Sequence, residues 1–172
     1  MNLIDNLIRK LTIVIFFALS LMMIPVSISK FFNLPIYIHK QFLPYFNQFK
    51  KDNDKYKSGA NFYKLTTIFS DNVPSGVAAY CRPVTNSVVV SSQVWDRLST
   101  QGRKALLYHE WGHCTLRRDH TEDLMYPYSF CPKSIMYPYV DNVERCFETL
   151  GEEYIEELFT NPYNYEKFSR GI

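Results

Sequence analysis

The sequence carries little net charge. It has 19 Lys and Arg against 17 Asp and Glu, a formal net charge of +2 over 172 residues. The basic residues are scattered along the chain, whereas a nucleic-acid surface concentrates them. Internal repeats and low-complexity segments are also missing. We therefore expect no nucleic-acid partner and, from the 47% hydrophobic content, one domain with a proper core.

The sequence also lacks any CxxC pair, which argues against a zinc ribbon. Its four cysteines lie after the N-terminal segment: Cys81, Cys114, Cys131 and Cys146. In an oxidising compartment an even set of this kind forms disulfides. We predict two disulfides, and three connectivities remain open.

Charge is absent from residues 11–29, a long apolar run that follows Arg9 and Lys10. A positive segment followed by an apolar one is the layout of a secretory signal. Ser27 and Ser29 have the size and spacing of a cleavage site. The run is also about long enough to span a bilayer, which takes roughly 20 residues, so an uncleaved anchor is the alternative.

These features predict two regions. Residues 1–29 are a signal peptide or a signal anchor, with possible membrane association through residues 11–29. Residues 30–172 form a domain that is exported and is periplasmic, extracellular or membrane-anchored facing outward. The oligomeric state is left open.

Hydrophobic periodicity and turn residues divide the exported part into elements. Helices are predicted over residues 43–56, 94–116 and 142–159, with Ser99 or Thr100 capping a start near Gln101. Strands are predicted over residues 62–70, 77–83 and 87–92.

Histidine is scarce, with four in the whole chain. His39 is isolated, and we interpret it as an ordinary histidine. The other three stand close together in "HEWGHCTLRRDH", from His109 to His120. Because His109 and His113 are four positions apart on a predicted helix, they project from the same face, one turn apart.

Two histidines at this spacing can hold one metal ion, and Glu110 stands directly after the first. This HExxH arrangement is typical of zinc proteases, in which the glutamate is the general base. A catalytic zinc site has three protein ligands and one open position. His120 lies beyond the predicted helix end, where a turn can bring it back to the metal as the third ligand.

The segment resembles the zinc-binding segment of metzincin metalloproteases, whose pattern is HExxHxxGxxH followed by a Met-turn. The stretch "SIMYPYV", Ser134 to Val140, is similar to such a Met-turn, with Met136 beneath the metal. Met125 in "DLMYPYS" is the alternative, but it lies close behind His120. The resemblance implies an α+β fold: a small, twisted, mainly antiparallel or mixed sheet packed on an active-site helix, and a C-terminal helix after the Met-turn.

The chain departs from the metzincin pattern in two places. Leu116 stands at the glycine position, so the turn after the helix must be made otherwise. Asp119 stands at the third-ligand position, and some metzincins use aspartate there. We prefer His120, one residue further on, because neutral imidazole is the commoner zinc ligand.

These observations predict an exported zinc metalloprotease that hydrolyses peptide bonds in a peptide or protein substrate by zinc-activated water. His109, His113 and His120 hold Zn²⁺, and Glu110 is the catalytic general base. Tyr137 or Tyr139 is a candidate to stabilise the oxyanion, and the sequence does not choose between them.

Three alternatives stay open. One is a gluzincin-type protease with a downstream glutamate ligand, for which the candidates are Glu144, Glu148, Glu152 and Glu153. Another is a non-catalytic exported binding protein stabilised by zinc, against which the intact Glu110 argues. The last is a structural envelope protein with disulfides and no metal.

Overall fold

The structure is a computed structural model that describes residues 36–125 and 130–161. They belong to a compact unit, Pro35–Ile172. The predicted signal peptide or anchor, residues 1–29, lies outside the described residues. Among the helices that are described, none is both long and apolar enough to cross a membrane.

Four strands form one sheet in the order β1-β2-β4-β3. Their bounds are β1 Tyr37–Ile38, β2 Thr66–Ser70, β3 Ala79–Arg82 and β4 Ser87–Ser91. The pairs β1–β2 and β2–β4 are parallel, and β3–β4 is antiparallel. The sheet is mixed, as predicted, although parallel pairs outnumber the antiparallel one. Strand β3 forms one edge of this sheet.

The sheet differs from the prediction at its start. Strand β1 was not predicted, and β2 begins at Thr66 rather than at Phe62. Lys64 has a left-handed φ of 55°, which interrupts extended chain. The Asn86 side chain donates to the Tyr63 carbonyl at 2.7 Å and so holds the chain in this turn before the strand begins.

The structure contains four helices within the described residues: α2 Leu43–Tyr56, α3 Ser92–Trp95, α4 Thr100–Leu116 and α5 Val140–Thr160. Helix α2 matches the prediction, and α5 runs slightly beyond the predicted range. The predicted helix over residues 94–116 is not continuous, because the chain breaks between α3 and α4. The predicted start near Gln101, with Ser99 as its cap, is confirmed. Ser91 caps α3, and the Ser99 hydroxyl caps α4 by accepting the Gly102 N–H at 3.0 Å.

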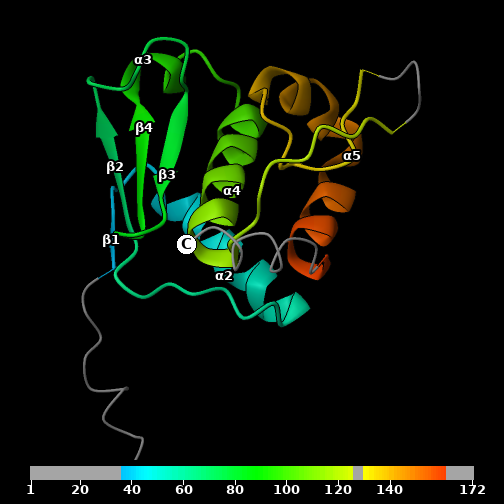
Figure 1. Cartoon of the computed structure of the whole chain (residues 1–172), viewed down its shortest axis with the longest axis horizontal. Coiled ribbons are helices and arrows are strands. Elements are labelled where there is room, and N and C mark those ends of the chain that lie inside the picture. Colours follow the sequence, from blue (N-terminus) through cyan, green and yellow to red (C-terminus); the bar gives the residue numbers. More distant parts are fainter. Residues whose placement is uncertain (1–35, 126–129, 162–172) are drawn as a thin grey trace, which may run out of the picture. The chain divides into compact units, whose positions relative to one another are not determined.

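Helix α4 lies between the sheet and α5 (Figure 1). Side chains on several of its faces are fixed by neighbouring elements. The Trp111 indole N–H donates to the Thr67 hydroxyl of β2 at 3.0 Å, and the Tyr108 hydroxyl donates to the Asp52 carboxylate of α2 at 2.6 Å. Because buried polar groups need such partners, these bonds fix the rotation of α4 about its axis.

All four cysteines form disulfides. Cys81–Cys114 joins the edge strand β3 to α4, and Cys131–Cys146 joins the preceding loop to α5. The predicted number of disulfides is confirmed, and the structure selects one of the three connectivities. Two disulfides are consistent with an oxidising, exported environment.

Candidate metal centre

Three histidine side chains meet beside α4. The Nε2 atoms of His109 and His113 are 3.0 Å apart, as the helical spacing predicts. The His120 Nε2 lies 3.0 Å from that of His109 and 3.1 Å from that of His113. The three ring nitrogens therefore converge on one point.

The other ring nitrogen of each helical histidine faces a backbone carbonyl. His109 Nδ1 lies 2.8 Å from the Ile135 oxygen, and His113 Nδ1 lies 2.5 Å from the Arg118 oxygen. A carbonyl oxygen only accepts hydrogen bonds, so both Nδ1 atoms carry the proton. Each neutral ring then presents a lone pair at Nε2. Two lone pairs at this separation cannot bond to each other, and a cation between them satisfies both.

Burial keeps these rings neutral. Burial, with a smaller contribution from the neighbouring His113, lowers the pKa of His109 to about 3. Burial lowers the pKa of His113 to about 4, and it also lowers the pKa of the more exposed His120. Neutral imidazole is the form that binds metals, and the group His109, His113 and His120 could hold a metal ion.

Glu110 follows His109 on α4 and lines the same groove as the three histidines. It is buried, with 5% of its surface exposed. Burial raises the pKa of Glu110 to about 8, against a hydrogen bond from the Cys81 backbone that lowers it. The second carboxylate oxygen, Oε2, has no hydrogen-bond partner among the described residues. A buried polar atom without a partner calls for an explanation, and a catalytic role is one of those known.

The turn after α4 explains how His120 reaches the two helical histidines. Arg117 ends the helix with a left-handed φ of 58°. The next amide N–H, that of Arg118, donates to the Gly112 carbonyl at 3.1 Å, a bond typical of helix C-terminal caps. Although Leu116 stands where metzincins have glycine, the turn is made one residue later.

Met136 packs against Gly112, which lies between His109 and His113 on α4. It is fully buried, and a Cβ atom added at Gly112 would lie 2.8 Å from its sulfur. Glycine at this position therefore permits the close approach. Met125, the alternative, is bonded by its amide to the Cys131 carbonyl at 3.0 Å instead.

An open groove of about 870 Å³ runs past the histidines and Glu110. One side is formed by the edge strand β3 and the loop before it, and the other by the chain that enters α5. Arg118 and Asp119 also line it. The groove leaves room for a ligand beside the three ring nitrogens.

Other sequence-predicted candidates lie outside the histidine group. Asp119 is not a member of it, nor is any of the four downstream glutamates, Glu144, Glu148, Glu152 and Glu153. Glu144 lines the groove but accepts hydrogen bonds from the amide and hydroxyl of Ser99. His39 packs edge-on against Phe69, at a centroid distance of 5.0 Å, as expected for an ordinary histidine.

Three backbone groups of the site were not predicted. They are the carbonyls of Ile135 and Arg118 and the amide of Cys81. All residue types have a backbone carbonyl and all except proline have an amide N–H, so no sequence pattern could have distinguished these groups. Only the fold shows which of them face the site.

No family model, curated protein or solved structure matches the chain. The likeness to metzincins is therefore a likeness of motif. What the site can do follows from the chemistry of its own residues.

The identity of the third ligand can be tested by metal affinity. We expect His120→Ala to weaken zinc binding far more than Asp119→Ala, because the His120 Nε2 lies within 3.1 Å of the other two ring nitrogens. Asp119 acts on His113 and His120 through its charge. Its removal is expected to weaken binding by roughly 10–100-fold at most.

Zinc titration of both variants against a chromogenic chelator gives the ranking. If Asp119→Ala proves the more damaging change, the third ligand is Asp119 and His120 is an ordinary loop residue.

Proposed function

We propose that the chain is an exported, zinc-dependent metalloprotease. The proposal rests on one observation: three converging, neutral ring nitrogens and the buried carboxylate of Glu110 line the same open groove. The two disulfides support export.

The donor set fits zinc. Three imidazoles and an open position are the ligand set of catalytic zinc in several hydrolases, and imidazole suits zinc among the common divalent ions. When bound, zinc supplies a Lewis acid that polarises a carbonyl and makes a water nucleophilic at neutral pH. A nearby dication also stabilises the Glu110 carboxylate and opposes the rise in its pKa that burial causes.

Glu110 moves the proton in this mechanism. The Cys81 backbone hydrogen-bonds to the Glu110 carboxylate, and this carboxylate lines the groove, where it would accept a proton from the attacking water. The same carboxyl group then donates that proton to the leaving amine. Its burial limits competition from bulk water.

The walls of the groove favour a peptide substrate. Strand β3 lines the groove and pairs with β4 as an edge strand. The backbone groups of an edge strand that do not face its neighbour can pair with an extended peptide. Of the two tyrosines considered for the oxyanion, Tyr139 lines the groove and is 66% exposed, so it is the one placed to meet a bound peptide.

A non-catalytic, zinc-stabilised binding protein is the second candidate. It would share the three histidines, but structural zinc sites are typically closed by four protein ligands. The described residues supply three donors to this group. The open groove and the unpaired Glu110 oxygen favour catalysis.

The proposal is tested by metal-dependent proteolysis. Full-length protein is incubated with casein or a peptide library, with a zinc chelator and then with excess Zn²⁺. We expect cleavage that stops with the chelator and returns with zinc. Stoichiometric zinc in the protein without cleavage of any peptide would favour the binding protein instead.

A further inference from the structure

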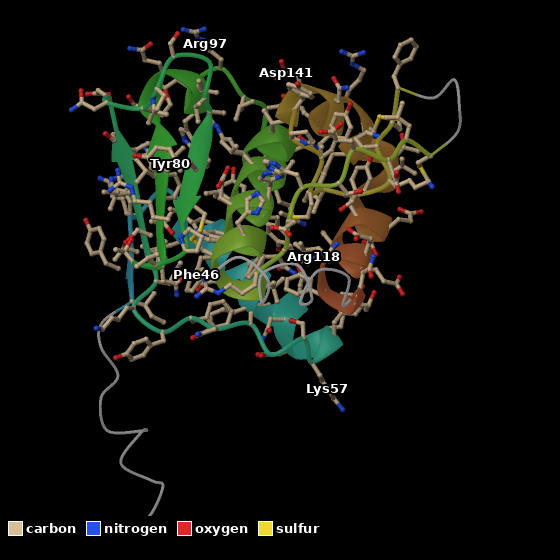
Figure 2. The ribbon with its side chains drawn as sticks, viewed as in Figure 1. Phe46, Lys57, Tyr80, Arg97, Arg118 and Asp141 are labelled. Carbon is tan, nitrogen blue, oxygen red and sulfur yellow. A yellow bond between two sulfur atoms is a disulfide. The ribbon has the colours of Figure 1, made fainter. Side chains whose placement is uncertain are left out.

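A carboxylate from the far end of α5 holds together two segments behind the histidines. Glu157 accepts hydrogen bonds from the Arg118 guanidinium, through Nη2, and from the Ser134 hydroxyl at 2.6 Å. Figure 2 shows Arg118 between α4 and α5. Arg118 and Ser134 lie on different loops, so one side chain connects both loops to α5.

The first of these loops orients His113. The Arg118 carbonyl lies 2.5 Å from His113 Nδ1, so any movement of Arg118 moves the acceptor that fixes this ring. The Arg118 guanidinium also donates to the carbonyls of Glu157 at 3.1 Å and Leu158 at 2.8 Å. These bonds attach the residue to the C-terminal end of α5.

The second loop orients His109. The Ser134 hydroxyl accepts the Met136 amide at 3.0 Å while it donates to Glu157. Ile135 lies between these two residues, and its carbonyl is the acceptor for His109 Nδ1 at 2.8 Å. The bonds of Ser134 therefore fix the peptide groups that flank this carbonyl.

We propose that Glu157 is a positioning residue of the metal centre, whose carboxylate fixes through Arg118 and Ser134 the two carbonyls that orient His113 and His109. This inference rests on the proposed role of these histidines as metal ligands. Glu157 touches neither histidine. It acts through two separate chains of hydrogen bonds that both end at an Nδ1 atom.

The charge of Glu157 matters because Arg118 is buried, with 6% of its side chain exposed. A buried guanidinium that loses its carboxylate is left with an uncompensated charge. Arg118 also lines the groove, so the released guanidinium can turn toward solvent there. Its carbonyl then no longer keeps a fixed direction toward His113.

A purely structural ion pair would behave differently. If Glu157 only attached α5 to the rest of the fold, its loss would lower stability and leave the histidine rings as they are. A positioning role requires that His109 and His113 both respond, although they bond to different loops. His39, which packs against Phe42 and Phe69 and has no hydrogen bond to Glu157, Arg118 or Ser134, should not respond.

The first measurement uses the metal-free, ¹⁵N-labelled, full-length protein. Histidine ¹H–¹⁵N correlation spectra report which ring nitrogen carries the proton. We expect a fixed Nδ1–H form for His109 and His113 in the parent protein, and mixed forms for both in Glu157→Gln. Glu156→Gln, a change at an exposed neighbour on the same helix, should leave both rings unchanged.

The second measurement is zinc affinity by chelator competition. We expect Glu157→Gln to bind zinc roughly 10–100-fold more weakly than Glu156→Gln, the loss typical of groups that orient metal ligands. Ser134→Ala removes one hydroxyl and should affect His109 more than His113. This milder variant keeps the test available if Glu157→Gln does not fold.

Unchanged histidine tautomers together with unchanged zinc affinity, in variants that differ from the parent only in thermal stability, would overturn the proposal. The tautomer measurement needs neither zinc nor a substrate. A parent protein that cleaves no peptide therefore refutes the proposed protease but leaves the role of Glu157 to be decided by the spectra.

Discussion

Glu110→Gln is expected to reduce peptide hydrolysis by roughly 10²–10⁴-fold, the usual contribution of a general base, while the metal stays bound. Glutamine keeps the size of the side chain and can still accept the Cys81 amide hydrogen bond. It cannot take a proton from water. The loss should appear in kcat rather than in KM, because substrate binding does not need the base.

The measurement compares initial rates of cleavage for Glu110→Gln and Glu156→Gln at equal zinc content. Glu156 is exposed on α5, so its substitution controls for the loss of one negative charge. A metal-loaded Glu110→Gln protein that cleaves as fast as the control would reject the proposed proton transfer.

His109→Ala is expected to abolish stoichiometric zinc binding, from about one ion per chain in the parent protein. His109 is the most buried of the three histidines. Its replacement by alanine removes both a ring nitrogen donor and the bond to the Ile135 carbonyl. Two remaining imidazoles do not complete a typical protein zinc site. Plasma emission spectroscopy after dialysis measures the retained metal.

His39→Ala is the matched control, because it removes a histidine from the β1 end of the fold. Its ring contacts with Phe42 and Phe69 make a modest loss of stability the expected effect, with zinc content unchanged. Full zinc occupancy in His109→Ala would show that another part of the chain holds the metal.

Periodicity and spacing predicted the parts of the molecule that depend on local sequence. The range of α2 and most of α5 follow from apolar positions at helical spacing. The convergence of His109 and His113 follows from the geometry of one helical turn. His120 is preferred to Asp119 because imidazole is the commoner zinc ligand. Its Nε2 lies 3.1 Å from that of His113, within the histidine group.

The remaining features depend on contacts between distant residues. The parallel pairing of β2 with β4 cannot be read from either strand, because both are short apolar runs. Glu157 was not among the glutamates considered, since nothing in α5 distinguishes it until Arg118 and Ser134 lie beside it.

The Cys81–Cys114 disulfide joins one wall of the groove to the helix that carries His109 and His113. The amide that holds Glu110 belongs to Cys81, whose sulfur is bonded to Cys114, the neighbour of His113. In the cytosol such thiols stay reduced. In the reduced protein, non-covalent contacts alone would hold β3 to α4. Closing this loop, with a sequence separation of 33, destabilises the unfolded chain by about 3–4 kcal/mol through its lost entropy. In the proposed exported protease, oxidation outside the cytosol would thus hold the Cys81 backbone more firmly beside the catalytic carboxylate.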